Sequence, residues 1–137
     1  MIKTLTQEEL AERWHEIKPH IEIAIEHGMG ETSAHDMFVG AMMGHYECWE
    51  VLDDTGNMVS LGFVRVNRFD QHSQLQVVTT AGEGWDEYGP PCLEFIENTA
   101  KQLGCKYVTI WGRPGWYKKL KKYGYNNVYT VLAKEIE

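Results

Sequence analysis

The sequence lacks the features of membrane and secreted proteins. No apolar run approaches the ~20 residues that a membrane-spanning helix needs. The first ten residues, MIKTLTQEEL, carry acidic residues where a secretory signal peptide has its apolar region. The three cysteines (Cys48, Cys92 and Cys105) show no paired spacing, which is typical of a chain in a reducing compartment. We therefore expect a cytoplasmic protein that contacts no membrane.

Basic residues and catalytic signature motifs are also scarce. The chain has 13 Lys and Arg against 20 Asp and Glu, and this net charge of −7 disfavours nucleic-acid binding over the whole surface. The six histidines show no His-x-x-x-His spacing, and neither a Walker motif nor Gly-x-Ser-x-Gly occurs. The sequence thus predicts no metal site.

What the chain does contain is enough apolar surface for one folded domain. Apolar residues make up 43% of the 137 positions and aromatic residues 12%, which is ordinary for a domain with a hydrophobic core. No repeat, low-complexity tract or linker divides the sequence. We predict a single domain over residues 1–137.

The N-terminal third is predicted to be mainly helical. Residues 2–5 form a candidate first strand, and Thr6 with Glu9 makes a capping box that starts a helix. Pro19 removes a helical hydrogen bond, so we expect two helical pieces that meet near it. Another helix is expected over residues 34–43.

The rest of the chain alternates strands with helices. Strand-forming residues and turn signals predict three antiparallel strands, then a helix that starts at Pro90, a strand, a short basic helix and a last strand. A strand–helix–strand crossover implies a parallel pair. We therefore predict an α/β fold with a mixed central sheet of about six or seven strands and helices on both faces. These later strands are expected near residues 46–52, 58–66, 75–80, 105–112 and 128–136. The apolar stripe of the helix that starts at Pro90 is expected to comprise Leu93, Ile96, Ala100 and Leu103.

Two segments resemble the GNAT superfamily of N-acetyltransferases. The stretch "GPPCLEFIENTAKQLGCKYVTI" resembles the GNAT central helix and fifth strand. The stretch "RPGWYKKLKKYGYNNV" resembles the GNAT helix that ends in Tyr-x-x-x-Gly-Phe. More narrowly, "GRPGWYKKLKKYGY" is similar to GNAT-like proteins of tailed bacteriophages, some of which are encoded among virion assembly genes. The resemblance implies a GNAT-like fold.

The resemblance also implies where an acyl donor binds. In GNAT enzymes the pantetheine arm of acetyl-CoA lies between the fourth and fifth strands, and the pyrophosphate meets backbone N–H groups at the next helix N-terminus. We expect this cleft where residues 79–82 separate from Trp111 and Gly112, because glycine permits bends and close approach of a ligand. The candidate acetyl-CoA-binding residues are Thr79, Thr80, Ala81, Gly84, Gly89 and Arg113.

The loop before the central helix departs from the family motif Arg/Gln-x-x-Gly-x-Gly/Ala. Residues 84–89 read Gly-Trp-Asp-Glu-Tyr-Gly, so only the last glycine is kept. Glu83, Asp86 and Glu87 place carboxylates where the pyrophosphate would lie, and the two prolines that follow remove N–H donors. We predict that these acids hold the helix N-terminus empty of phosphate. Arg113 either clamps an oxyanion or phosphate, or pairs with Glu83 or Asp86 across the cleft mouth.

Acyl transfer to an amine needs a base for the ammonium and an acid for the leaving thiolate. Glu83, His72 and Glu50 are the candidate bases, and Glu83 has the best position, although a solvated loop acid is the alternative. Leu120 occupies the position that many GNAT enzymes give to a tyrosine acid. Tyr117, one turn earlier, either replaces that acid or packs the helix onto the sheet.

Two functions remain open at this point. The first is an acyl-CoA-dependent N-acyltransferase of atypical, phage-encoded type that acts on the amine of a small molecule or protein in the host cytoplasm. The second is a non-catalytic GNAT-like protein that contacts another protein, such as a phage structural protein during virion assembly. The order of elements permits the first, and the altered loop with Leu120 favours the second.

Overall fold

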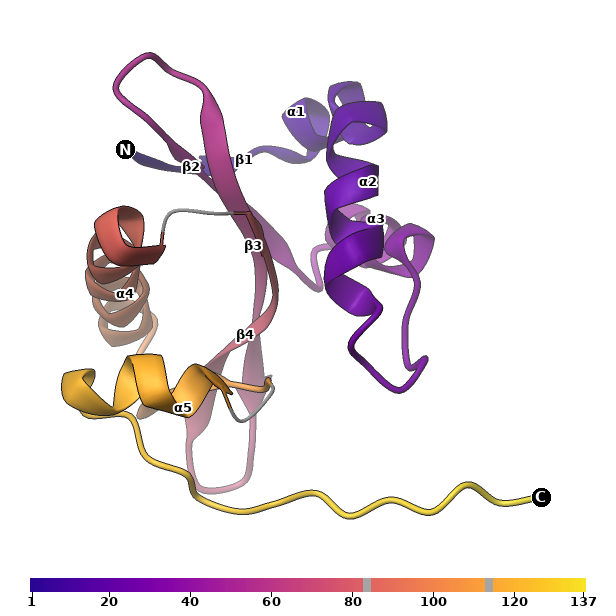
Figure 1. Cartoon of the computed structure of the whole chain (residues 1–137), viewed down its shortest axis with the longest axis vertical. Helices are drawn as coiled ribbons and strands as arrows, with labels where there is room; N and C mark the ends of the chain where they lie inside the picture. The colour runs from indigo at the N-terminus through magenta and orange to yellow at the C-terminus, as the bar shows by residue number, and fades with distance from the viewer. Residues whose placement is uncertain (83–84, 113–114) are drawn as a thin grey trace.

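A computed structural model describes residues 1–82, 85–112 and 115–137. The described part is built on one sheet whose five strands lie side by side in chain order (Figure 1). The pairs β1–β2, β2–β3 and β3–β4 are antiparallel, and the pair β4–β5 is parallel. The strands are β1 (Ile2–Leu5), β2 (Glu47–Leu52), β3 (Met58–Arg68), β4 (Ser73–Gly82) and β5 (Tyr107–Ile110).

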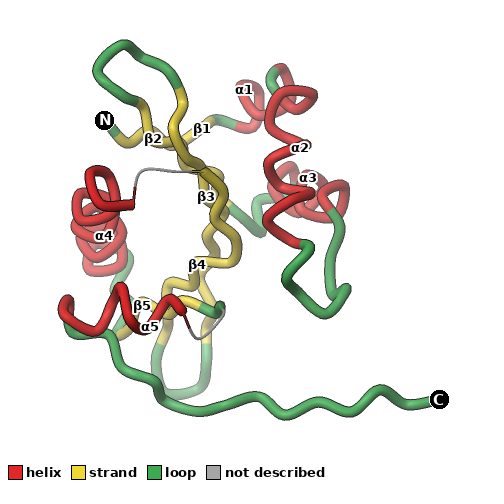
Figure 2. Tube along the Cα trace, in the orientation of Figure 1, coloured by secondary structure: helices red, strands yellow, loops and turns green. Residues whose placement is uncertain are grey.

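Helices cover both faces of this sheet. They are α1 (Gln7–Glu12), α2 (Trp14–Ile25), α3 (Ala34–Met42), α4 (Trp85–Gln102), α5 (Gly115–Leu120) and the short 3₁₀ helix η1 (Lys121–Tyr123). The first three lie on one face, and α4 with α5 lies on the other (Figure 2). None of these helices combines the length and the apolar character that crossing a membrane requires. The predicted mixed sheet with helices on both faces is confirmed.

Each face of the sheet contributes to its own hydrophobic core. Phe63, Ile17 and Met37 are fully buried between the sheet and the helices α1–α3. On the other face, Trp49 meets Phe95 of α4 edge-on, with ring centroids 4.9 Å apart. Neighbouring side chains of a strand point to opposite faces, so the central strands supply both cores at once.

The described sheet has fewer strands than the six or seven predicted. Residues 2–5 do form a strand, β1, but residues 128–136 form none, and their large apolar side chains are exposed. A strand exists only where a partner backbone completes its hydrogen bonds. No backbone hydrogen bond joins residues 127–137 to the other described residues. The predicted last strand therefore has no partner strand in the described part of the chain.

The break in the N-terminal helical region lies at Arg13 and not at Pro19, so that prediction is wrong. Arg13 has φ −101° and ψ 7° and separates α1 from α2. Its guanidinium donates to Glu50 on β2 at 2.8 Å. Pro19 is exposed inside α2, and the helix continues through it without the hydrogen bond that an N–H there would make. The capping box of Thr6 and Glu9 is confirmed by both of its hydrogen bonds.

The stripe predicted on α4 is buried except at its last position. Leu93, Ile96 and Ala100 are at most 9% exposed, whereas Leu103 lies past the helix end and is 51% exposed. We expect Leu93→Ala to lower the free energy of unfolding by ~2–5 kcal/mol, because it removes buried methyl groups and leaves a cavity. The matched control Leu103→Ala should change it by less than about 0.5 kcal/mol. Urea titrations followed by circular dichroism measure both, and equal losses would contradict this arrangement.

Candidate functional site

β4 and β5 pair over only part of the length of β4. Their parallel pairing stops at Val77 and Ile110, whereas β4 continues to Gly82 beside β3. In the β3–β4 ladder Val78 is an extra residue between the paired Val77 and Thr79. Such a bulge bends its strand and increases the local twist. The predicted separation of the second half of β4 from β5 is confirmed.

Three of the candidate acetyl-CoA-binding residues lie in this separated half of β4. They are Thr79, Thr80 and Ala81. The hydroxyl of Thr79 donates to Met37 Sδ at 3.7 Å, and Ala81 packs against the core under α1–α3. Thr80 is exposed. Their backbone edge toward β5 has no partner strand in the described part of the chain. An extended ligand with amide groups can form the hydrogen bonds that a neighbouring strand would form.

Gly82 ends β4 in a conformation that favours glycine. Its φ is +127°, and a Cβ atom there would lie 2.5 Å from the Cα atom of Ser60 on β3. Any side chain at this position would push β4 away from β3. The absence of a side chain at Gly82 therefore allows the end of β4 to lie close to β3.

α4 begins at Trp85, upstream of the predicted start at Pro90. Residues 85–89, interpreted as a loop from the sequence, form its first turns instead. A proline is well suited to a helix start, but Pro90 and Pro91 lie inside α4, where neither has an N–H group for a helical hydrogen bond. Among the described residues, the N–H groups that lack an intrahelical partner at the helix start belong to residues 85–87. The inference that Pro90 and Pro91 remove these donors is wrong.

Gly89 is packed against an aromatic ring. It is buried within α4, and a Cβ atom there would lie 2.5 Å from Cε3 of Trp85. The Trp85 ring meets Trp116 of α5 edge-on at 5.5 Å, and a Cβ atom on Gly112 would lie 2.8 Å from Trp116 Cδ1. The two tryptophans thus join the segments that follow β4 and β5. The sequence contains one signal of these contacts. Trp85 lies four residues before Gly89, and Trp116 lies four residues after Gly112.

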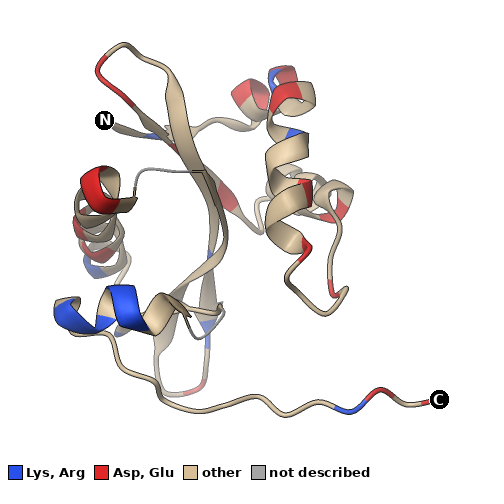
Figure 3. Cartoon of the chain, viewed as in Figure 1, with Lys and Arg blue, Asp and Glu red and all other residues tan. Residues whose placement is uncertain are grey.

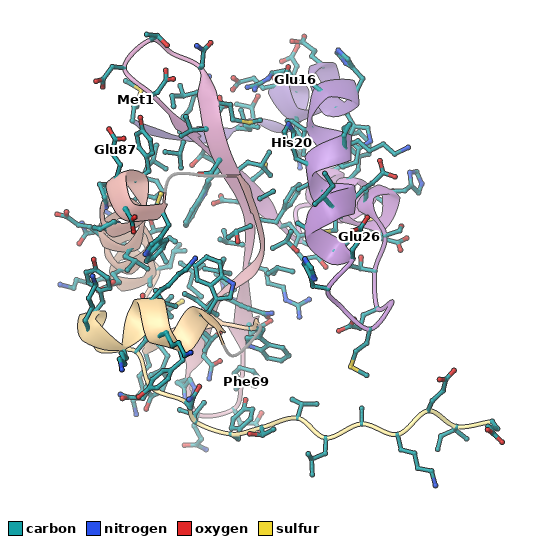
Figure 4. The ribbon with its side chains drawn as sticks, in the orientation of Figure 1. Met1, Glu16, His20, Glu26, Phe69 and Glu87 are labelled. Atoms are coloured by element: carbon teal, nitrogen blue, oxygen red, sulfur yellow. The ribbon has the colours of Figure 1, made fainter. Side chains whose placement is uncertain are left out.

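Negative charge gathers at the N-terminus of α4. Asp86 and Glu87 are exposed in its first turn, and Figure 4 shows Glu87 at that end of the helix. Burial and the negative charges of Glu87, Asp53 and Asp54 raise the pKa of Tyr88. The turn between β2 and β3 therefore adds two acids that lie far away in sequence (Figure 3). A pyrophosphate at this end would meet like charges.

Three predicted site residues fall outside the described ranges. They are Glu83, Gly84 and Arg113. The role of Glu83 as base, the place of Gly84 in the phosphate loop and both alternatives for Arg113 stay predictions. Their chain neighbours Gly82, Trp85 and Gly112 do lie around the end of the gap between β4 and β5.

The two other candidate bases lie away from this gap. Glu50 is buried on β2, and its carboxylate accepts a hydrogen bond from Arg13 at 2.8 Å. His72 lies at the opposite end of β4, where its ring centroid is 5.1 Å from that of Tyr107. Among the described residues, no three His, Cys, Asp or Glu side chains converge as metal ligands. Glu83 lies outside the described ranges, so its role as the base stays a prediction.

Known proteins resemble this chain in structure rather than in sequence. No protein-family model matches it, and no curated protein sequence matches it. A glucosamine-6-phosphate N-acetyltransferase from Arabidopsis thaliana superposes with a TM-score of 0.66 at 13% identity, covering 100% of this chain and 98% of its own. An acetyltransferase from Trypanosoma brucei superposes with a TM-score of 0.67 at 12% identity, with 99% of each chain covered. A GNAT family acetyltransferase from Staphylococcus aureus superposes with a TM-score of 0.65 at 13% identity, covering 99% of this chain and 98% of its own.

This agreement covers 99–100% of this chain and 98–99% of each of the other three chains. The chain has the GNAT acetyltransferase fold. At these identities the likeness establishes the fold and leaves the activity to the site. The narrower similarity to phage proteins gains no support from these structures.

In this GNAT fold, α5 is the helix to which the resemblance assigns the general acid. Leu120, at the family position, is buried at 3% exposure. Tyr117 is 38% exposed, and its hydroxyl forms no hydrogen bond with the described residues. Trp116 packs on Trp85 of α4, and both alternatives for Tyr117 stay predictions. Tyr117 therefore presents an accessible phenol on α5.

Proposed function

We propose that this GNAT-fold chain is an acyl-CoA-dependent N-acyltransferase that transfers an acyl group to an amine. The observation that carries the proposal is that the second half of β4 pairs with β3 but not with β5. The backbone edge of β4 beside the end of β5 is therefore open. Acetyl-CoA is the first candidate donor, because its pantetheine arm is extended and carries amide groups. These amides match the unpaired N–H and C=O groups of residues 79–81.

Different residues of the proposed site carry out the different steps of acyl transfer. Backbone N–H groups of β4 hold the arm and stabilise the oxyanion that forms when the amine attacks the acyl carbon. Glu83 accepts a proton from the ammonium of the acceptor, which frees the neutral amine to attack the acyl carbon, and Tyr117 gives a proton to the thiolate when the carbon–sulfur bond breaks. Gly84, Gly89 and Arg113 belong to the phosphate end of the site, with Gly89 acting through the packing of Trp85. Glu83, Gly84 and Arg113 enter this account from the sequence alone.

The acceptor is an amine of a small molecule or of a protein. The net charge of −7 attracts cationic amines and repels nucleic acid, so an ammonium-bearing acceptor suits the surface. We place the reaction in the cytoplasm, which is the host cytoplasm if the chain is phage-encoded.

A non-catalytic role in a protein–protein contact, such as one with a phage structural protein in virion assembly, is the second candidate. Two observations favour it. Asp86 and Glu87 lie at the end of α4 where a pyrophosphate would bind, and Leu120 is buried where the family has its acid. Under this candidate acetyl-CoA does not bind at all, which separates it from the first.

Calorimetric titration with acetyl-CoA distinguishes the two candidates. We expect saturable binding that tightens about 3- to 10-fold in the double variant Asp86→Asn, Glu87→Gln, because two exposed like charges near the pyrophosphate are removed. A control pair, Glu12→Gln with Glu22→Gln, removes the same charge from α1 and α2 and should leave the affinity unchanged. Absence of binding heat for all three proteins would overturn the acyltransferase proposal and favour the second candidate.

A further inference from the structure

A row of polar side chains crosses three neighbouring strands at the point where β4 and β5 begin to separate. Arg65 on β3 lies opposite Gln76 on β4, and Gln76 lies opposite Thr109 on β5. The next pair along the two parallel strands, Val77 with Ile110, is the last pair before the gap. This polar row therefore borders the end of the gap at which β4 and β5 meet.

The polar row points to the face of the sheet that carries α1–α3. Its strand neighbours Val64, Leu75 and Val77 belong to the core under α4, and neighbouring side chains of a strand point to opposite faces. The end of the β3–β4 hairpin extends past the helices α1–α3 (Figure 2). Arg65 is only half-buried, so a small molecule can reach its guanidinium from this face.

The guanidinium of Arg65 is held in one orientation. Its Nε donates to Oε1 of Gln76 at 3.1 Å, and Asn67 Nδ2 donates to the same oxygen at 2.7 Å. Its Cζ atom lies 5.9 Å from the centre of the Tyr46 ring, which adds a cation–π contact. That ring packs on α3, because a Cβ atom on Gly40 would lie 2.5 Å from Tyr46 Cε2. A group that is already oriented loses less freedom when it binds a ligand.

The polar row presents hydrogen-bond donors that lack acceptors among the described residues. Gln76 is 4% exposed, and its oxygen serves two donors while its amide nitrogen donates to no described residue. The Thr109 hydroxyl is buried and has no hydrogen-bond partner in the described part of the chain. The terminal nitrogens of Arg65 meet no carboxylate of the described residues either. Unpaired buried donors cost free energy, so this arrangement indicates a ligand that supplies acceptors.

A single carboxylate fits the donors of the polar row. Its two oxygens match the fork of a guanidinium and can accept further hydrogen bonds from an amide and a hydroxyl. The row contains one cation, Arg65, which balances one negative charge. A phosphate with two charges would lack a second cation in the row and would meet the negative net charge of the chain. The chemistry of the row therefore favours a carboxylate.

We propose that the row of Arg65, Gln76 and Thr109 binds a carboxylate of the acceptor, which makes the acceptor a small amino acid. The inference rests on the proposed function, in which the phosphate end of the acyl-CoA donor lies beyond Gly82, at the start of α4. The acyl end of the donor then lies at the other end of the gap, near Val77. A carboxylate on the polar row holds the acceptor one residue away along β4, so that its amine faces the acyl carbon.

NMR titration of the full chain with 4-aminobutanoate tests the polar row directly. We expect saturable shifts of the backbone amides of Gln76 and Thr109, and an affinity about 10- to 100-fold above that for 4-aminobutanamide, which lacks the negative charge. Arg65→Met should abolish this preference. The control Arg68→Met removes the same charge from an exposed residue of β3 whose side chain points to the other face, and it should bind as the wild type does.

Thr109→Val is a second variant, chosen to leave the fold intact. It replaces a hydroxyl that has no partner among the described residues by a methyl group of similar shape. The free energy of unfolding should therefore not fall, whereas the affinity for 4-aminobutanoate should fall about 3- to 10-fold. Circular dichroism checks that Arg65→Met is folded, and Thr109→Val decides the test if it is not.

Equal affinity for 4-aminobutanoate and its amide overturns the proposal, and so does an unchanged affinity in the variant that decides the test. Tighter binding of 3-aminopropylphosphonate than of 4-aminobutanoate also overturns it, since the row would then select a doubly charged anion. The proposed function has its own readout, which is the binding of acetyl-CoA. Acetyl-CoA binding without a preference for the carboxylate overturns this inference alone. A preference for the carboxylate without acetyl-CoA binding supports the carboxylate site and overturns the proposed function alone.

Discussion

Replacement of Tyr117 by phenylalanine is expected to lower kcat for acyl transfer by about 10²- to 10⁴-fold, the usual contribution of a general acid. The change removes only a hydroxyl group that forms no hydrogen bond with the described residues, so the fold and the affinity for acetyl-CoA should stay as they are. Release of the free thiol of CoA, measured with an amine that supports turnover, gives kcat. Calorimetry gives the affinity.

Tyr123→Phe is the matched control for this change. Tyr123 lies on η1 and is 38% exposed, the same fraction as Tyr117. The control should keep the wild-type kcat. Full activity of Tyr117→Phe would contradict the role of Tyr117 as acid, and equal losses in both variants would indicate a general effect on this part of the chain.

Phe63→Ala is expected to lower the free energy of unfolding by ~3–5 kcal/mol, a large part of the ~5–15 kcal/mol that stabilises an ordinary domain. Phe63 is fully buried under α1–α3 and meets Tyr46 edge-on at 6.3 Å. It also pairs with Thr79 across the ladder, directly beside the bulge that separates β4 from β5. The substitution should therefore weaken acetyl-CoA binding as well as the fold.

Phe69→Ala provides the control for the loss of a phenyl ring. Phe69 lies between β3 and β4 at the far end of the sheet and is 54% exposed. Its removal should change the free energy of unfolding by less than about 0.5 kcal/mol. Thermal and urea unfolding measure both variants, and a loss for Phe63→Ala no larger than that of the control would show that the core is wrongly described.

Local signals in the sequence predicted the parts of the fold that depend on neighbouring residues. The Thr6 and Glu9 capping box, the turn that begins at Asp53 and the alternation along β4 all act within a few positions. The separation of β4 from β5 was predicted from the glycines that follow β4. The bulge at Val78 that accompanies it had no signal, because a bulge is a property of two strands paired in register.

Features that depend on distant partners could not be predicted in the same way. Pro90 and Pro91 pointed to a helix start, yet α4 begins upstream at Trp85, whose ring packs on Gly89 and on Trp116 of another helix. The acids of the β2–β3 turn reach the start of α4 only through the fold. Residues 128–136 have the composition of a strand, but composition does not say whether a partner strand lies beside them.

Hydrogen exchange of β4 with and without acetyl-CoA tests the central claim most directly, because it reports on the backbone edge that carries the proposed function. Amides of residues 79–82 should exchange more slowly in millimolar acetyl-CoA, while those of β1, at the other edge of the sheet, should be unchanged. Unchanged exchange of residues 79–82 under these conditions would contradict the claim that the gap between β4 and β5 holds an acyl-CoA donor.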